Sequence, residues 1–150
     1  MFLPRGRATM DWIVNEIKPM IDREYRTIPF RECTAIGGSS MGGLMALYGV
    51  TCYNKVFQRA AVLSPSLWVA PSKLYNLVAR ANMRFDTTIY MDYGSDEINN
   101  HDGSADALIS MATLLLKKRA NLTFRIVPGG THSEASWEQQ IPVFMDCLKL

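Results

Sequence analysis

The stretch from Thr34 to Tyr48, TAIGGSSMGGLMALY, decides the fold class of this chain. A short apolar run meets a cluster of glycines and serines, and a helix-forming stretch follows at once. Residues 38–42, GSSMG, fit the pattern G-x-S-x-G with Ser40 as the central serine; a pattern centred on Ser39 fails because position 41 is methionine. Such a pattern is typical of a strand that turns sharply into a helix and holds a serine hydroxyl at the apex, with Gly38 and Gly42 leaving room around it. The stretch therefore predicts a nucleophile elbow at Ser40.

A cluster of glycines and serines also occurs in two other kinds of structure. A phosphate-binding loop does not fit, because no Gly-Lys-Ser/Thr follows and the spacing is not G-x-G-x-x-G. An ordinary turn between a strand and a helix remains an alternative. The rest of the chain has to decide between that turn and a catalytic serine.

Composition narrows the class of protein. The 150 residues, 48% of them hydrophobic and 20% charged, predict one globular domain spanning residues 1–150. A net charge of +2 gives no reason to expect nucleic acid as a partner. No apolar run reaches the roughly 18 residues of a membrane helix, and the first seven residues lack the apolar core of a signal peptide. Three widely spaced cysteines without a C-x-x-C pair indicate a reducing compartment, so we expect a cytoplasmic protein without metal or organic cofactor.

Helical and strand patterns alternate along the chain. We expect helices at 9–25, from the elbow to about 52, and at 73–82, 105–119 and 136–148. Strands are expected before Ser40 and at 59–64, 87–93 and 122–127. In the first helix, Thr9 is the expected N-cap and Pro19 is expected to kink or break the helix. The alternation predicts an α/β fold in which a parallel sheet of about four strands lies between two helical layers.

Polar residues follow three of these strands, at the edge of the sheet where ligands bind in such folds. They are Ser40, then the pair Asp96 and Glu97, then His132. Serine, acid and histidine in this order are typical of α/β-hydrolase triads. A neighbouring imidazole can take the proton of the serine hydroxyl as it attacks a carbonyl carbon, and a carboxylate fixes the imidazole tautomer. Spacing alone does not separate Asp96 from Glu97 as the acid, and His101 reads as a polar loop residue.

Several motifs resemble the putative-esterase (esterase D-like) family of the α/β-hydrolase superfamily. They are residues 36–43, Phe57 with residues 60–66, residues 94–97, and residues 129–134 with Trp137. That family includes S-formylglutathione hydrolases, feruloyl and acetylxylan esterases, and enterobactin-type trilactone esterases. The resemblance implies that Glu97 is the acid and His132 the base.

The resemblance covers only the C-terminal portion of the family's fold. Family members carry further strands upstream, so the strand that leads to Ser40 would be an edge strand here. The loop that supplies a second oxyanion donor also lies upstream in the family, which leaves the backbone N–H of Met41 as the donor that the sequence assigns. A homodimer is expected to cover the exposed edge of the sheet.

These observations together predict a serine carboxylic-ester hydrolase with the triad Ser40, His132 and Glu97. It would form an acyl-enzyme with small or medium acyl esters. Trp68 and Tyr48 are candidates for the substrate pocket, although aromatic residues at such positions also serve as core. The alternatives are an acyltransferase with the same triad, and a catalytically weak or silent fragment that acts as an interaction module.

Overall fold

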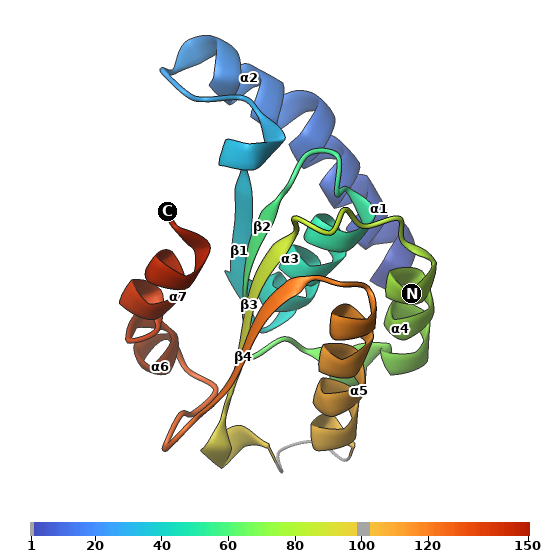
Figure 1. Cartoon of the computed structure of the whole chain (residues 1–150), viewed down its shortest axis with the longest axis vertical. Helices are drawn as coiled ribbons and strands as arrows, with labels where there is room; N and C mark the ends of the chain where they lie inside the picture. The colour runs from blue at the N-terminus through green and yellow to red at the C-terminus, as the bar shows by residue number, and fades with distance from the viewer. Residues whose placement is uncertain (1, 99–102) are drawn as a thin grey trace.

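The computed structural model describes residues 2–98 and 103–150, so His101 lies outside the described part of the chain. Its centre is a four-stranded sheet in the order β1-β2-β3-β4, with every neighbouring pair parallel (Figure 1). The strands are β1 (Ala35–Ser39), β2 (Arg59–Leu63), β3 (Thr88–Gly94) and β4 (Asn121–Val127). The predicted α/β fold with a four-stranded parallel sheet is confirmed.

Helices cover both faces of the sheet, as predicted. On one side lie α1 (Phe2–Trp12), α3 (Met41–Cys52), α4 (Pro71–Arg80) and α5 (Ser104–Lys117). On the other side lie α6 (Glu134–Glu138) and α7 (Ile141–Leu148), as Figure 1 shows. Among the described residues, no helix combines the length and the apolar character needed to cross a membrane.

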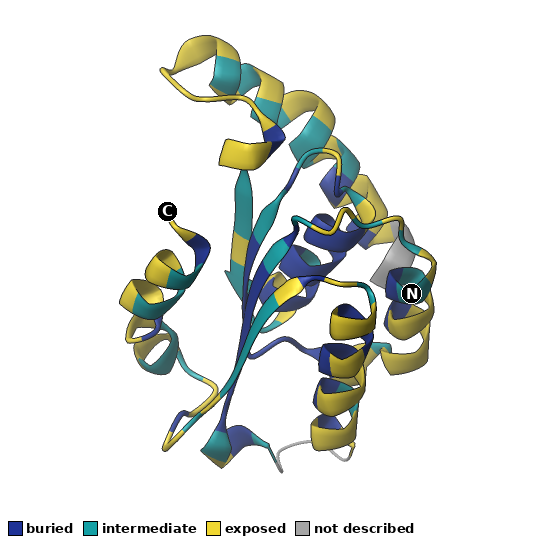
Figure 2. Ribbon diagram, in the orientation of Figure 1, coloured by how far each residue is buried: buried dark blue, intermediate teal, exposed yellow. Residues whose placement is uncertain are grey.

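The core is divided between the two faces because successive strand residues point to opposite sides. On β2, Ala60 and Val62 belong to the larger apolar cluster, which α3, α4 and α5 complete. Ala61 and Leu63 belong to the smaller one, which contains Leu148 of α7. In Figure 2 the buried residues accordingly follow the middle of the sheet and the inner side of α3. This two-sided burial fixes the register of the strands and hence the position of the residues at their carboxyl ends.

The first helical segment differs from the expectation. It begins at Phe2 rather than Thr9, and the Thr9 hydroxyl donates to the carbonyl of Arg5 within the helix instead of capping it. Pro19 does not break the helix, because a π-helical turn, η1 (Ile13–Ile17), precedes it and α2 (Lys18–Glu24) continues. Proline lacks an N–H and its ring crowds the carbonyl four residues earlier, and a wider turn accommodates both.

The last helix also differs from the expectation. The single helix predicted at 136–148 is two helices, α6 and α7, separated at Gln139 and Gln140. Pro142 lies in the first turn of α7, where its missing N–H costs no intrahelical hydrogen bond. The break lets Gln140 turn inward, and its side chain is buried against the sheet.

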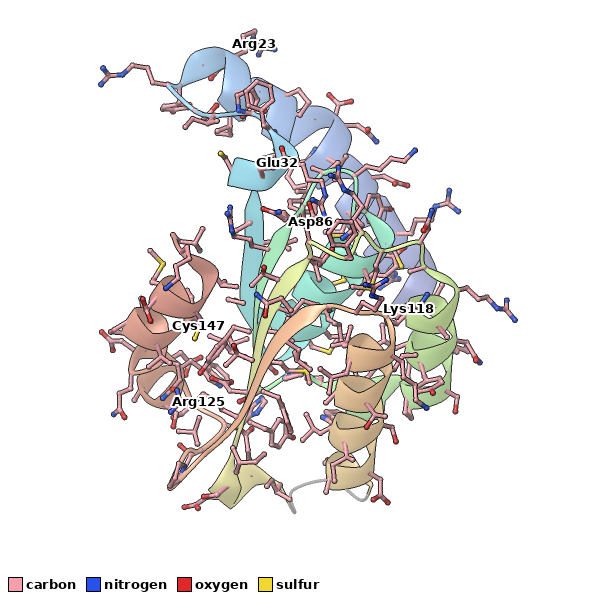
Figure 3. The ribbon with its side chains drawn as sticks, viewed as in Figure 1. Arg23, Glu32, Asp86, Lys118, Arg125 and Cys147 are labelled. Atoms are coloured by element: carbon pink, nitrogen blue, oxygen red, sulfur yellow. The ribbon has the colours of Figure 1, made fainter. Side chains whose placement is uncertain are left out.

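Polar side chains fasten the amino ends of the strands, away from Ser40. The buried Arg31, in the 3₁₀ turn η2 (Arg31–Cys33), donates to the Asp86 carboxylate at 3.0 Å and to the Thr87 hydroxyl at 3.2 Å. Figure 3 shows Asp86 at this end of the sheet. Burial alone raises the pKa of Asp86, but Arg31, Arg84 and Gln58 together lower it by more, so the net pKa is lowered. These contacts anchor the segment that leads into β1.

Within the described residues, β1 pairs only with β2. Its other edge leaves backbone donors and acceptors of Ala35–Ser39 without a strand neighbour. The prediction that the elbow strand is an edge strand is therefore confirmed. This matters for the site because β1 carries Ser40 at its carboxyl end.

Candidate active site

Ser40 occupies the sharp turn between β1 and α3. Its backbone angles, φ 56° and ψ −120°, lie in a region that residues other than glycine rarely adopt. The turn is held by its own backbone: the N–H of Ser40 donates to the carbonyl of Leu63 at 2.9 Å, and its carbonyl accepts from the N–H groups of Leu44 and Ser66. Strained backbone persists when surrounding contacts determine it, and such strain is concentrated at functional sites. This is the sharp strand-to-helix turn, with a serine at its apex, that the sequence pattern predicts.

The glycines around the elbow are not equally constrained. A Cβ added to Gly38 would lie 2.6 Å from the backbone carbonyl carbon of Gly42, which no real Cβ contact tolerates. A Cβ at Gly42 itself would meet nothing within 4 Å, so the expected steric need for glycine there is wrong. Gly43 is the second constrained position, because its Cβ would lie 2.6 Å from the carbonyl oxygen of Leu63. Gly43 lets α3 start directly against β2.

His132 reaches Ser40 from the loop that follows β4. Its Nε2 lies 2.8 Å from Oγ of Ser40, and its Nδ1 lies 2.5 Å from Oε2 of Glu97. With the Nδ1 proton donated to the carboxylate, Nε2 is left as the acceptor for the hydroxyl of Ser40. Trp137 packs edge-on against the imidazole, with ring centroids 5.0 Å apart and an interplanar angle of 85°. One ring nitrogen thus faces the serine and the other faces the acid.

Glu97 closes this chain of hydrogen bonds. It ends the 3₁₀ turn η4 (Ser95–Glu97) directly after β3, and only 1% of it is exposed. While Oε2 faces His132, Oε1 accepts from the N–H of Gly94 at 2.7 Å and from the hydroxyl of Ser64 at 2.5 Å. Asp96 is exposed, and its carboxylate accepts from the hydroxyl of Ser95 instead. The structure thus brings Ser40, His132 and Glu97 together and leaves Asp96 outside the group.

Close packing of two loops sets the distance between Glu97 and His132. A Cβ at Gly94 would overlap the carbonyl oxygen of Gly130, so these two glycine backbones touch. The N–H of Asp96 donates to the same carbonyl at 3.1 Å, and the N–H of Gly129 donates to the hydroxyl of Ser95 at 2.8 Å. The turn after β3 and the loop after β4 are therefore fastened together as one unit.

The other predicted site residues are placed differently. Met41 takes the first position of α3, where a backbone N–H has no intrahelical partner. Trp68, in the 3₁₀ turn η3 (Leu67–Val69), is 42% exposed and lies two residues after Ser66. Tyr48 is only 7% exposed, lies in the main core and packs edge-on against Tyr53. The expectation that Tyr48 lines the substrate pocket is therefore wrong, because its ring is enclosed by the fold.

Three residues without a predicted catalytic role also lie at the site. Oγ of Ser66 is 3.3 Å from Oγ of Ser40, the Ser64 hydroxyl contacts Glu97, and the indole N–H of Trp137 donates to Ser64 at 2.9 Å. A signal was available for Ser64, because it directly follows β2 and the carboxyl ends of parallel strands meet at one edge of the sheet. The contribution of Trp137 depends on how α6 folds back, which residue spacing does not reveal.

Asp92 is a second buried carboxylate near Glu97. It lies in β3, whereas Glu97 lies in the turn that follows this strand. It is 1% exposed and accepts from the hydroxyl of Tyr90 at 2.9 Å and from the N–H of Ser64 at 3.3 Å. Burial raises the pKa of Asp92 to about 6, although these donors act in the opposite direction. Arg125, on the same side as α6 in Figure 3, donates to the Tyr90 hydroxyl at 3.4 Å. Asp92 therefore belongs to a polar layer beneath the site.

The hollows nearest the predicted site residues differ in size. A groove of about 720 Å³ runs between α4 and α5 and includes Leu67 and Tyr75 but none of Ser40, Glu97 and His132. A cavity bordering Glu97 has a volume of only about 10 Å³, room for at most one water molecule. The side chain of His132 is 37% exposed, so a substrate would reach Ser40 from solvent. Among the described residues, no group of three or more His, Cys, Asp and Glu side chains is arranged to hold a metal.

The following solved structures have similar folds and are longer than this chain. A ferulic acid esterase superposes with a TM-score of 0.72 at 19% identity, over 93% of this chain and 60% of its own. BES protein from Bacillus cereus gives 0.80 at 18% identity, over 95% of this chain and 55% of its own. The enterobactin esterase FES from Shigella flexneri superposes with a TM-score of 0.70 at 20% identity, over 91% of this chain and 36% of its own. The chain thus spans 60% or less of these proteins, and the likeness establishes the fold.

Comparison by sequence gives the family. No curated protein matches the chain. A family profile does: the family described as "Putative esterase" matches residues 4–145, nearly the whole chain. The match includes the elbow, the acid turn and the histidine loop. The chain belongs to this esterase family and represents the C-terminal portion of its α/β-hydrolase-like fold.

Proposed function

We propose that this chain is a serine carboxylic-ester hydrolase with Ser40 as nucleophile, His132 as general base and Glu97 as the acid. The observation that carries the proposal is the unbroken path from Oγ of Ser40 through both ring nitrogens of His132 to Glu97. Membership of the esterase family supports the same reaction. The three residues follow three different strands, so the fold and not the local sequence brings them together.

The geometry defines the steps. Nε2 of His132 takes the hydroxyl proton while Oγ of Ser40 bonds to the carbonyl carbon of the ester. The ionised Glu97 stabilises the imidazolium, which then gives the proton to the departing alcohol as the C–O bond breaks. Water attacks the resulting acyl-enzyme by the same route, with His132 as base, and releases the carboxylic acid and Ser40. Protons and electron pairs balance over the cycle without a cofactor.

Met41 would supply one donor to the oxyanion. Its backbone N–H directly follows the nucleophile at the start of α3, where the helix dipole also favours negative charge. Loss of a single oxyanion donor typically lowers turnover by about 10²–10³-fold. If Met41 acts alone, we therefore expect slow turnover with an intact nucleophile.

Small or medium acyl esters are the substrates that we propose. Two observations support this: Met41 and the His132 side chain are partly open to solvent, and the 68–85 segment between β2 and β3 is too short for a large lid. Trp68, exposed close to Ser66, is the proposed contact for the substrate. Two of the similar solved structures are named as a ferulic acid esterase and an enterobactin esterase, which agrees with an ester substrate.

Turnover of p-nitrophenyl acetate and butyrate by the purified chain and by Ser40→Ala tests the proposal. We expect release of p-nitrophenol above the buffer rate by the chain and the buffer rate with Ser40→Ala. Equal rates for the two would refute the esterase proposal and favour a silent interaction module. Analysis of products with added alcohols distinguishes an acyltransferase, which would yield a new ester in place of the free acid.

We also propose that residues 1–150 form one domain and that a second copy of the chain covers β1. Three exposed apolar residues precede β1 and its open edge in the chain, Tyr25, Ile28 and Phe30, with exposures of 64%, 61% and 67%. An unpaired strand edge beside exposed apolar side chains is a template for association. Light scattering at micromolar concentration should give the mass of a dimer, and a monomeric mass would reject this arrangement.

A cytoplasmic location is proposed from the cysteines. Cys33, Cys52 and Cys147 are all free, and burial raises the pKa of Cys52. Free thiols persist in a reducing compartment. Fractionation of cells should recover the protein with the cytoplasm, and recovery from the medium would contradict this assignment.

A further inference from the structure

We infer that Ser64 is a positioning residue for Glu97, and that Trp137 fixes Ser64 in that role. The inference rests on the proposed esterase reaction and adds two residues to its machinery. Ser64 directly follows β2 and is 2% exposed. Its hydroxyl lies between two partners, Oε1 of Glu97 at 2.5 Å and the indole nitrogen of Trp137 at 2.9 Å.

The direction of both hydrogen bonds is fixed by chemistry. An indole N–H can only donate, and an ionised carboxylate can only accept. The Ser64 hydroxyl must therefore accept from Trp137 and donate to Glu97. A serine hydroxyl normally rotates to suit its surroundings, but here a single orientation satisfies both neighbours.

The backbone of Ser64 is held as firmly as its side chain. Its φ of 40° is positive, which is uncommon for a residue other than glycine. The N–H of Ser64 donates to the carbonyl oxygen of Asp92 at 3.1 Å and approaches the Asp92 carboxylate at 3.3 Å. These contacts extend the β2–β3 ladder by one residue past the end of β2. The hydroxyl is thereby directed at the acid turn after β3.

Trp137 connects the acid to the base. Its N–H fixes the hydroxyl that donates to Glu97, while the same ring packs edge-on against His132. Glu97 in turn contacts Nδ1 of His132. The four side chains form a closed ring of contacts, so Glu97 and His132 are oriented from two sides. Without the Ser64 hydroxyl, Oε1 would keep only the N–H of Gly94, and the carboxylate could rotate away from Nδ1.

Three variants test this role in the full chain. Ser64→Ala and Ser64→Gly both remove the hydroxyl, but only glycine adopts the positive φ without strain. Comparison of the two variants therefore distinguishes the loss of the hydroxyl from strain in the backbone. Trp137→Phe keeps a ring against His132 and removes only the N–H donor. We expect both Ser64 variants to lower kcat by about 10–100-fold with KM within about twofold, as for lost hydrogen bonds to a charged group. Trp137→Phe should lower kcat by about 2–10-fold.

A spectroscopic readout distinguishes positioning from general stability. The Nδ1 proton of His132 should give a resolved downfield NMR signal in the parent chain. In Ser64→Ala and Ser64→Gly this signal should broaden or shift upfield, while the dispersion of the other signals is retained. Far-UV circular dichroism provides the control for folding.

Full kcat and an unchanged Nδ1 signal in a folded Ser64→Gly would overturn the inference. If neither Ser64 variant folds, Trp137→Phe decides: a lower kcat with unchanged KM and a shifted Nδ1 signal supports it, and parent-like values overturn it. Failure of the esterase proposal itself looks different, because Ser40→Ala would then turn over substrate as fast as the parent chain.

Discussion

Nε2 of His132 lies 2.8 Å from Oγ of Ser40, although 92 positions separate the two residues in the sequence. They follow β4 and β1, the two outer strands of the sheet, which are about 14 Å apart at ordinary strand spacing. The loop after β4 must therefore reach back across β3 and β2. Its contact with the acid turn through Gly94 and Gly130 makes this possible. The site depends on how the loops are fastened as much as on the order of the strands.

Alanine at Gly38 and alanine at Gly42 should have opposite effects on the free energy of unfolding. Gly38→Ala brings a methyl group against the backbone of Gly42, which cannot move aside without shifting the start of α3. Overpacking of this kind costs about 1–3 kcal/mol or more of unfolding free energy. Gly42→Ala is the matched control: its Cβ meets open space, and alanine favours helix by about 0.5–1 kcal/mol. Urea unfolding of both variants measures the difference, and equal midpoints would contradict the elbow geometry.

Exchange of the two neighbouring acids should identify the acid of the triad. Glu97→Gln keeps the shape of the side chain but removes the charge that stabilises the imidazolium, so kcat should fall by about 10²–10⁴-fold. Asp96→Asn should stay within about twofold, because Asp96 is exposed and faces Ser95. Steady-state kinetics with p-nitrophenyl butyrate provides the comparison. A larger loss of kcat in Asp96→Asn than in Glu97→Gln would identify Asp96 as the acid instead.

Asp92 should make the stability of the folded chain fall as pH rises. Its pKa of about 6 lies above the ordinary value of 3.8 for aspartate, so the folded state binds the proton more tightly than the unfolded state. This tighter binding contributes on the order of 2–3 kcal/mol to the free energy of unfolding below about pH 4. The contribution is lost as the pH rises through about 6. Asp92→Asn cannot ionise and should lack this slope. Urea unfolding between pH 4 and 7 checks it, and parallel curves for parent and variant would contradict the prediction.

Substitution of Trp68 should weaken substrate binding, whereas substitution of Tyr48 should destabilise the fold. Trp68→Ala should raise KM for p-nitrophenyl esters several-fold with kcat nearly unchanged, because the exposed ring is proposed to contact substrate before and during the reaction alike. Tyr48→Ala removes a buried ring and should instead cost about 3–5 kcal/mol of unfolding free energy. Michaelis–Menten kinetics and thermal unfolding of both variants separate the two effects. An unaltered KM in Trp68→Ala would remove Trp68 from the pocket.

Much of the fold could be predicted because its signals are local. The small residues around Ser40 fit only a tight turn, and the apolar runs at 59–64, 87–93 and 122–127 are bounded by Pro, Gly or polar residues. Their alternation with helices restricts the sheet to a parallel one, and the carboxyl-end rule then places Ser40, Glu97 and His132 at one edge.

What could not be predicted depends on contacts between distant segments. Pro19 was expected to break a helix, but a π turn absorbs it, and sequence does not distinguish these outcomes. Tyr48 is a predicted candidate for the substrate pocket, yet its place two turns into α3 puts it in the core. The hydrogen bond from Trp137 to Ser64 forms only once α6 has folded back over the sheet. Gly43, not Gly42, is constrained because the limiting atom belongs to Leu63, a residue of the next strand.

The central claim is that Ser40 is an activated nucleophile, and covalent labelling tests it most directly. A fluorophosphonate probe reacts with an activated serine even where a weak oxyanion site makes turnover slow. After proteolysis and mass spectrometry, we expect a single adduct on Ser40, which is absent from Ser40→Ala and strongly slowed in His132→Gln. An adduct on another residue, or no adduct on the folded chain, would contradict the account.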